Sequence, residues 1–254
     1  MRQATSIDEV IQILGEIIAS EVEAASNMAF FPTLYKQVTE RIKQGIQNQE
    51  FDDNARMERL DVIFANRYIA AYDAYKSGGT PTKSWETAFK AADNQKLLIL
   101  QHLLLGINAH INLDLGIAVS ETMRADEPLE PIHDDFNKIN AILSDMADGV
   151  QKKIGRVSPL FSLLDKIMKG KEDLIASFSI EIARDEAWIF ANEYHASANK
   201  EQSLQERDTV IASIGARIAN IKSRFLRWVV KITRWFESKN VAKVVRILGG
   251  SEST

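Results

Sequence analysis

The chain contains no cysteine, which excludes disulfide bonds and thiolate metal sites. A chain without disulfides suits a reducing compartment, so the sequence predicts a cytoplasmic protein. Its first ten residues, MRQATSIDEV, also lack the apolar core of a secretory signal. Proline and glycine are scarce, with five and twelve among 254 residues. Because these two residues punctuate turns, their scarcity favours long helices over a sheet of many strands.

Charge is distributed unevenly along the chain, although the formal net charge is only −4. Residues 217–254 contain nine basic and two acidic residues, which gives a balance of +7. The other 216 residues contain 22 basic and 33 acidic residues, a balance of −11. Most of the surface would therefore repel phosphate groups, and we expect no nucleic-acid partner.

Apolar residues recur at helical spacing along almost the whole chain, and no run alternates as a half-buried strand would. A capping box formed by Ser6 and Glu9 opens the first predicted helix. Further along, a short helix is expected between Ser158 and Gly170, followed by a longer one from about Glu172. Short linkers join the predicted helices. The sequence predicts one all-α domain over residues 1–254, a bundle of about eight to ten helices around a buried central helix.

That central helix is Gln95–Val119, in which only Lys96 and Asp114 carry a formal charge. A helix that is apolar on every side belongs in a protein interior. Its length would also allow it to cross a membrane, but Asp114 alone would cost roughly 2.5–3.5 kcal/mol at bilayer depth. We therefore expect a core helix and not a membrane span.

Five polar residues interrupt this apolar helix: His102, Asn108, His110, Asn112 and Asp114. Buried polar groups are costly unless they are paired, so these residues indicate either a structural network or a functional site. His110 and Asp114 lie one helical turn apart and can meet, as can Asn108 and Asn112. His102 precedes His110 by a rise of about 12 Å, too far for both histidines to bind one metal ion.

We expect the site to combine His110 and Asp114 with Asp135 and Asn140 from the next helix and with Arg67. Arg67 lies on an otherwise apolar helix stripe, so its guanidinium needs a carboxylate, such as Asp114 or Asp135, or an anionic ligand. His110, Asp114 and Asp135 could ligate a divalent metal ion if other helices complete the site. Alternatively, Asp114 could orient His110 as a general base. A satisfied hydrogen bond in the core is the structural alternative.

Other catalytic patterns are weak or absent. The doublet His133-Asp134 resembles that of the HD phosphohydrolases, which would require His102 or His110 and Asp185 as further metal ligands. A two-residue doublet is weak evidence, and a simple charge at the start of a helix is the expected explanation. There is no phosphate-binding glycine loop, no Gly-x-Ser-x-Gly elbow and no His-Glu-x-x-His motif.

Residues 200–254 are expected to form a basic amphipathic segment docked on the acidic remainder of the protein. A long helix from about Glu201 to Glu237 would have basic residues over much of its surface. It would carry one apolar stripe, formed by Ile214, Ile218, Ile221, Phe225, Val229, Ile232 and Trp235. A helix of this kind can also lie on a membrane surface. Burial of the stripe against the protein is the expectation, and peripheral membrane contact is the alternative.

Several segments together resemble a bacterial protein family labelled only as a domain of unknown function. The match rests on the run Asn108-Ala109-His110-Ile111-Asn112-Leu113-Asp114-Leu115, with support from Phe64-Ala65-Asn66-Arg67-Tyr68, Asp135-Phe136, Ile139-Asn140, Ala183-Arg184 and Ala187-Trp188. The resemblance extends from about Phe31 to Trp188. It implies an all-helical fold and the same choice of residues, but no reaction.

Two functions follow from these observations. The first is a hydrolase-like or metal-assisted site for a small molecule, with His110 as base or ligand, Asp114 and Asp135 as orienter or ligands, and Arg67 as an anion clamp. The second is a non-catalytic binding or structural protein whose polar core fixes the helix register. Its basic C-terminal helix would then contact a partner or a membrane surface.

Overall fold

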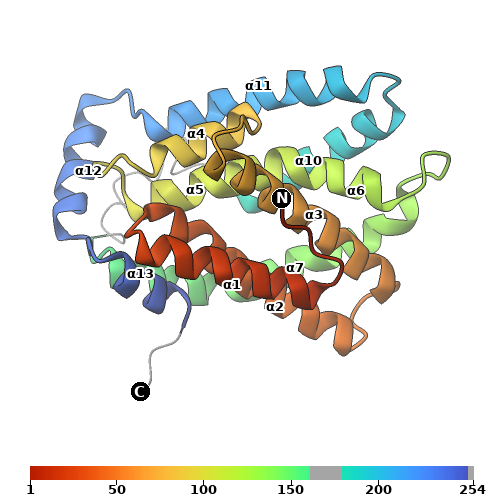
Figure 1. Cartoon of the computed structure of the whole chain (residues 1–254), viewed down its shortest axis with the longest axis horizontal. Helices are drawn as coiled ribbons and strands as arrows, with labels where there is room; N and C mark the ends of the chain where they lie inside the picture. Colours follow the sequence, from red (N-terminus) through yellow and green to blue (C-terminus); the bar gives the residue numbers. More distant parts are fainter. Residues whose placement is uncertain (161–178, 251–254) are drawn as a thin grey trace.

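The computed structural model describes residues 1–160 and 179–250, which form ten helices and no strand when Ile99–Thr122 is taken as one helix (Figure 1). The expected all-α class is therefore confirmed. The helix predicted between Ser158 and Gly170, and the start of the one predicted from Glu172, lie outside the described residues. The elements are α1 (Ile7–Glu23), η1 (Asn27–Ala29), α2 (Phe30–Gln47), α3 (Asn54–Lys76), α4 (Lys83–Ala91), α5 (Ile99–Ala109), η2 (His110–Leu115), α6 (Gly116–Thr122), α7 (Glu130–Val157), α10 (Ile180–Ala196), α11 (Lys200–Ala219), α12 (Arg224–Phe236) and α13 (Val241–Leu248).

The helix Ile99–Thr122 forms the centre of the bundle, as its apolar sequence predicts. It comprises α5, η2 and α6, and in Figure 1 it lies between α11 on one side and α1 and α2 on the other. Among the described residues it is the one helix long and apolar enough to cross a bilayer, but 89% of its most apolar 18-residue window is buried inside the bundle. Neighbouring helices therefore replace lipid as the apolar surroundings.

The central helix is not a uniform α-helix, which the sequence pattern does not reveal. Its six residues His110–Leu115 form the π-helical segment η2. Such wide turns are rare in proteins and occur frequently at functional sites. Both His110 and Asp114, the pair predicted from the sequence, lie within this segment.

Two glycines allow other helices to approach the central helix closely. A methyl group added at Gly106 would lie 2.5 Å from the Phe31 ring of α2, and one at Gly116 would lie 2.8 Å from the backbone oxygen of Ala187 in α10. A backbone atom cannot rotate away as a flexible side chain can. The absence of a side chain at Gly116 is thus a requirement of the α6–α10 contact.

The segment after residue 200 differs from the single long helix that the sequence predicts. The helix ends at Ala219, since Asn220 leaves the helical region with φ −122° and ψ 83°. Ser223 caps the start of α12 by accepting a hydrogen bond from the Leu226 amide at 3.3 Å. Helix α11 packs against α4 and α5, and α12 contributes to the apolar cluster around Leu97 and Leu105. The turn redirects the predicted apolar stripe, so that Val229 is buried whereas Trp235 is 79% exposed.

We predict that Gly116→Ala lowers the free energy of unfolding by about 1–3 kcal/mol, because the added methyl group must displace the α10 backbone. The matched control is Gly155→Ala in α7, where the methyl group would meet no atom of the described residues within 4 Å. That variant should gain about 0.5–1 kcal/mol from improved helix propensity. Urea unfolding followed by circular dichroism measures both values, and equal effects of the two substitutions would contradict the predicted close contact.

Candidate functional site

A buried carboxylate ties three elements together at the centre of the molecule. Asp114 of η2 is 1% exposed, and its Oδ1 accepts a hydrogen bond from Arg67 Nε of α3 at 2.9 Å. Its Oδ2 accepts one from Trp85 Nε1 of α4 at 2.7 Å. Burial alone would raise the pKa of Asp114, but the Arg67 charge and the hydrogen bonds hold it below its ordinary value. Asp114 is therefore an anion, and the Arg67–Asp114 pairing expected from the sequence is present.

The imidazole of His110 lies beside this carboxylate within an aromatic shell. Its Nδ1 is 3.5 Å from Asp114 Oδ2, longer than an ordinary hydrogen bond. The Phe64 ring is stacked on it with centroids 3.5 Å apart, and Tyr35 meets it edge-on at 4.5 Å. Burial lowers the pKa of His110 although Asp114 opposes this effect, so the imidazole is neutral at neutral pH. Neither ring nitrogen has a hydrogen-bond partner among the described residues.

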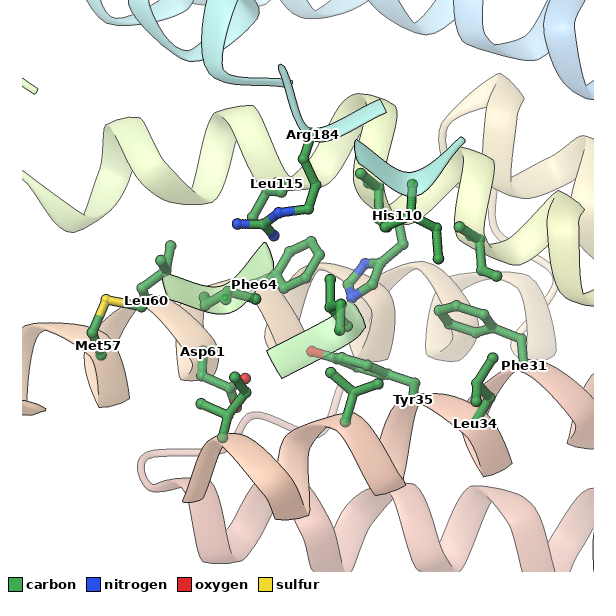
Figure 2. Close-up of a pocket in the computed structure, with 17 residues that line it drawn as sticks. Phe31, Leu34, Tyr35, Met57, Leu60, Asp61, Phe64, His110, Leu115 and Arg184 are labelled. Atoms are coloured by element: carbon green, nitrogen blue, oxygen red, sulfur yellow. The ribbon is translucent and has the colours of Figure 1, made fainter. Parts of the chain in front are cut away.

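His110 faces a cavity of about 100 Å³ between α2, α3, η2, α7 and α10 (Figure 2). Seventeen of the described residues line it, and thirteen of these are apolar. The four polar ones are Tyr35, Asp61, His110 and Arg184. Figure 2 shows Tyr35 with its hydroxyl group directed to the side where Asp61 lies, and Arg184 entering from the opposite side of the cavity. Few polar groups within an apolar enclosure are typical of a small-molecule site.

Asp61 is a cavity residue that the sequence analysis did not select. It is 8% exposed, and its Oδ2 has no hydrogen-bond partner among the described residues. Burial, followed by the nearby charge of Glu58, raises the pKa of Asp61 to about 7. The Tyr35 hydroxyl group likewise lacks a partner there. The sequence did contain one indication of Asp61. This residue lies on a helix stripe with the apolar residues Met57 and Phe64, just as Arg67 lies on a stripe with other apolar residues.

Arg184 brings a buried cation to the same cavity. Its side chain donates from Nε to Asn140 Oδ1 and from Nη2 to the Phe136 carbonyl oxygen, and its guanidinium lies 4.1 Å from the centre of the Phe136 ring. Burial lowers the pKa of Arg184 to about 9, which leaves it charged at neutral pH. No carboxylate among the described residues lies within ion-pair distance of it, although the charge of Asp185 opposes part of the burial effect on its pKa. Asn140 was expected beside His110. It instead accepts a hydrogen bond from Arg184, which lines the cavity.

Asp135 makes structural contacts near the start of α3 instead of lying beside His110. Its carboxylate accepts hydrogen bonds from the backbone amides of Asp52 and Asp53, at 2.7 and 2.9 Å, just before α3 begins. It also pairs with Arg56 and Lys138 at 3.4 and 3.1 Å. The expected set His110, Asp114 and Asp135 is therefore not assembled. Within the described ranges, no three histidine, aspartate or glutamate side chains are grouped so that they could hold a metal ion.

The remaining polar residues of the central helix make structural contacts. Asn112 donates to Asn108 Oδ1 at 3.1 Å, as their spacing predicts, and Asn108 donates to the Ile211 carbonyl oxygen of α11 at 3.0 Å. His102 packs edge-on against Phe30, and burial lowers its pKa to about 4. The asparagines thus hold α11 against the central helix, whereas His102 Nε2 has no hydrogen-bond partner among the described residues. None of the three lines the cavity of Figure 2.

The HD-type grouping has no geometric support. The ring of His133 is stacked on Trp188 with centroids 4.2 Å apart, and its Nε2 lies 3.2 Å from the Asn137 amide nitrogen. Asp185 is exposed on α10. These side chains therefore lie apart from His110, which is enclosed by aromatic rings.

We predict that Asp61→Asn becomes more stable relative to the wild-type protein as the pH rises from about 4 to about 7, by up to ~4 kcal/mol. The folded-state pKa of Asp61 is about 7 and lies above the unfolded value near 3.9, so ionisation destabilises the wild-type fold in this window. Below pH 4, Asp61 is largely protonated in both the folded and the unfolded wild-type protein, so the variant should have no such advantage. Chemical unfolding at several pH values measures the difference, and a pH-independent difference would show that Asp61 titrates normally.

Comparison with known proteins places most of the chain in one family. A family model described as "Family of unknown function (DUF5995)" matches residues 7–221. This match agrees with the resemblance predicted from the sequence. No curated protein and no solved structure matches the chain.

Proposed function

We propose that this protein, which belongs to the family of unknown function DUF5995, binds a small and largely apolar carboxylic acid in the cavity of Figure 2. One observation supports the proposal most strongly. A buried cation and several unpaired polar atoms converge on an otherwise apolar cavity, whereas buried polar groups are normally paired.

The polar groups of the cavity are suited to a carboxylate. Arg184 supplies a positive charge that has no carboxylate partner among the described residues, and such a buried charge is costly unless an anion compensates it. The Tyr35 hydroxyl group, the protonated Asp61 and one nitrogen of the neutral His110 can each donate a hydrogen bond. A carboxylate accepts such bonds at both of its oxygens.

The size and lining of the cavity limit the rest of the ligand. About 100 Å³ corresponds to roughly three molecules of liquid water, so the enclosed part of the ligand has only a few carbon atoms. The thirteen apolar lining residues favour a hydrocarbon chain or small ring. A short-chain monocarboxylate meets both requirements.

We predict that butyrate binds at least about tenfold more tightly than butanol, because the alcohol cannot compensate the Arg184 charge. Binding of butyrate should weaken as the pH rises from 6 to 8, since ionised Asp61, with a pKa of about 7, repels an anion. Titration calorimetry and ligand-observed nuclear magnetic resonance measure both effects. Equal affinity for alcohol and acid, or no binding of either, would contradict the proposal.

A matched pair of substitutions on α7 tests the location of the ligand. Leu143 and Met146 are both partly buried and pack against the same apolar cluster, but only Leu143 lines the cavity. Leu143→Trp should therefore abolish butyrate binding, whereas Met146→Trp should retain it. Loss of binding in both folded variants, or in neither, would place the ligand elsewhere.

Acid–base catalysis on a ligand of this kind is a second candidate, favoured by the combination of His110 and Asp61. A hydrolase-like reaction would begin with His110 taking a proton from water, whose oxygen then attacks the carbonyl carbon of an ester. The bond to the alcohol oxygen breaks, and protonated Asp61, with a pKa of about 7, supplies the proton to that leaving group. The proton held by His110 then returns to the Asp61 carboxylate, and the product is a small carboxylic acid, the ligand proposed above. No metal ion enters this scheme, because its expected ligand Asp135 is held near the start of α3.

If this candidate is correct, the protein hydrolyses p-nitrophenyl butyrate, and His110→Gln lowers kcat/KM by about 10²–10⁴-fold. Asn140→Asp, which changes a residue that contacts Arg184 and not His110, should alter KM more than kcat. The rate of p-nitrophenol release gives kcat and KM for both variants. Binding of butyrate without any His110-dependent hydrolysis would leave a binding protein and eliminate the catalytic candidate.

A further inference from the structure

Helix α12 has two opposite faces with different surroundings. Its buried face consists of Leu226, Val229, Val230 and Thr233, which pack into the bundle. At about 100° per residue, the opposite face carries residues spaced at i, i+4, i+7 and i+11. These four are Arg224, Trp228, Lys231 and Trp235, and we call them the outer ridge. Cationic and aromatic side chains alternate along it.

The aromatic side chains of α12 are unusually exposed. Trp235 is 79% exposed, Trp228 is 61% exposed and Phe236 is 60% exposed. Within residues 1–160 and 179–250, every strongly exposed phenylalanine or tryptophan lies on this helix. Large apolar side chains gathered on a surface mark a contact with a membrane or a partner. Tryptophan in particular is favoured where an apolar layer meets a polar one.

A basic groove of about 610 Å³ adjoins the outer ridge. It runs between α12, the turn that precedes this helix and the segment before α5, and Trp235 forms part of its wall. Its charged lining residues are Lys96, Arg227, Lys231, Arg234 and Lys239, and no acidic residue lines it within the part of the chain that the structure describes. Arg234 is paired with Glu237 at 3.4 Å, whereas no carboxylate among the described residues lies within ion-pair distance of Arg224, Lys231 or Lys239. The groove is thus suited to phosphate groups.

We infer that α12 docks on a membrane surface that contains anionic phospholipids. Trp228, Trp235 and Phe236 would enter the boundary between head groups and acyl chains, while the lysines and arginines contact lipid phosphates. Figure 1 places α12 at one edge of the molecule, and all four residues of the outer ridge are exposed. This geometry favours a membrane over an extended nucleic acid, which would also have to pass the acidic remainder of the chain, where the charge balance is −11.

The proposal predicts that the protein sediments with vesicles of phosphatidylcholine mixed with phosphatidylserine, and far less with phosphatidylcholine alone. Binding should weaken as salt concentration rises, because screening reduces the attraction of the basic residues. Indole fluorescence should shift to shorter wavelength with anionic vesicles and be quenched by brominated acyl chains, as Trp228 and Trp235 leave water. Equal binding to both vesicle types, or no binding, would overturn the proposal.

Two variants and one control assign the binding to the outer ridge. Arg224→Gln with Lys231→Gln should weaken vesicle binding roughly thirtyfold, given the usual contribution of each basic residue near an anionic surface. Trp228→Ala with Trp235→Ala should weaken it at least about tenfold and abolish the fluorescence shift. The control, Lys90→Gln with Lys152→Gln, makes the same change in charge on α4 and α7 and should bind as the wild-type protein does.

All three variants change exposed or partly exposed side chains, and circular dichroism melting curves verify that each is folded. Loss of binding in the control to the same extent as in the ridge variants would show a nonspecific effect of charge. Tighter binding to a single-stranded RNA oligonucleotide than to anionic vesicles would assign the surface to nucleic acid. Either result would overturn the assignment to membrane lipids.

Discussion

The placement of the central helix against α3 and α4 depends on one buried anion. The Asp114 carboxylate on the central helix is held by Arg67 of α3 and Trp85 of α4, so three elements are fixed relative to one another by one charged group. Removing one partner of such a buried pair typically costs about 3–5 kcal/mol, a large part of the 5–15 kcal/mol that stabilises an ordinary domain. Because His110 lies next to the same carboxylate, the position of the imidazole at the cavity follows from a contact that also stabilises the fold.

Features that arise within one helix could be predicted from the sequence. The apolar character of Gln95–Val119 indicates burial without reference to any other segment, and the spacing of Asn108 and Asn112 alone predicts their hydrogen bond. Arg67 stood out because a cation on an apolar stripe requires an anion, and Asp114 was one of two candidates. In each case the physical requirement is local, or few residues can satisfy it.

Features that depend on how helices face one another could not be predicted. Asp135 and Asn140 both lie on α7, the helix that follows the central helix along the chain. The rotation of α7 about its axis directs Asp135 to the start of α3 and Asn140 to Arg184. Asp61 and Tyr35 resemble ordinary positions of amphipathic helices until α2 and α3 are placed on either side of the cavity. Similarly, only the break at Asn220 shows that the apolar stripe expected after residue 200 is partly buried and partly exposed.

The π-helical segment divides the central helix into two halves with different neighbours. Helix α5 packs mainly against α2, α4 and α11, whereas α6 packs mainly against α3 and α10. One extra residue in a helix rotates everything that follows it by about 100°, so a wide turn at η2 offsets the faces of the two halves. One continuous helix can in this way pack against two separate sets of helices. Loss of one residue from this stretch would require all helices around α6 to rearrange, whereas insertions in the surface loops would leave their packing unaltered.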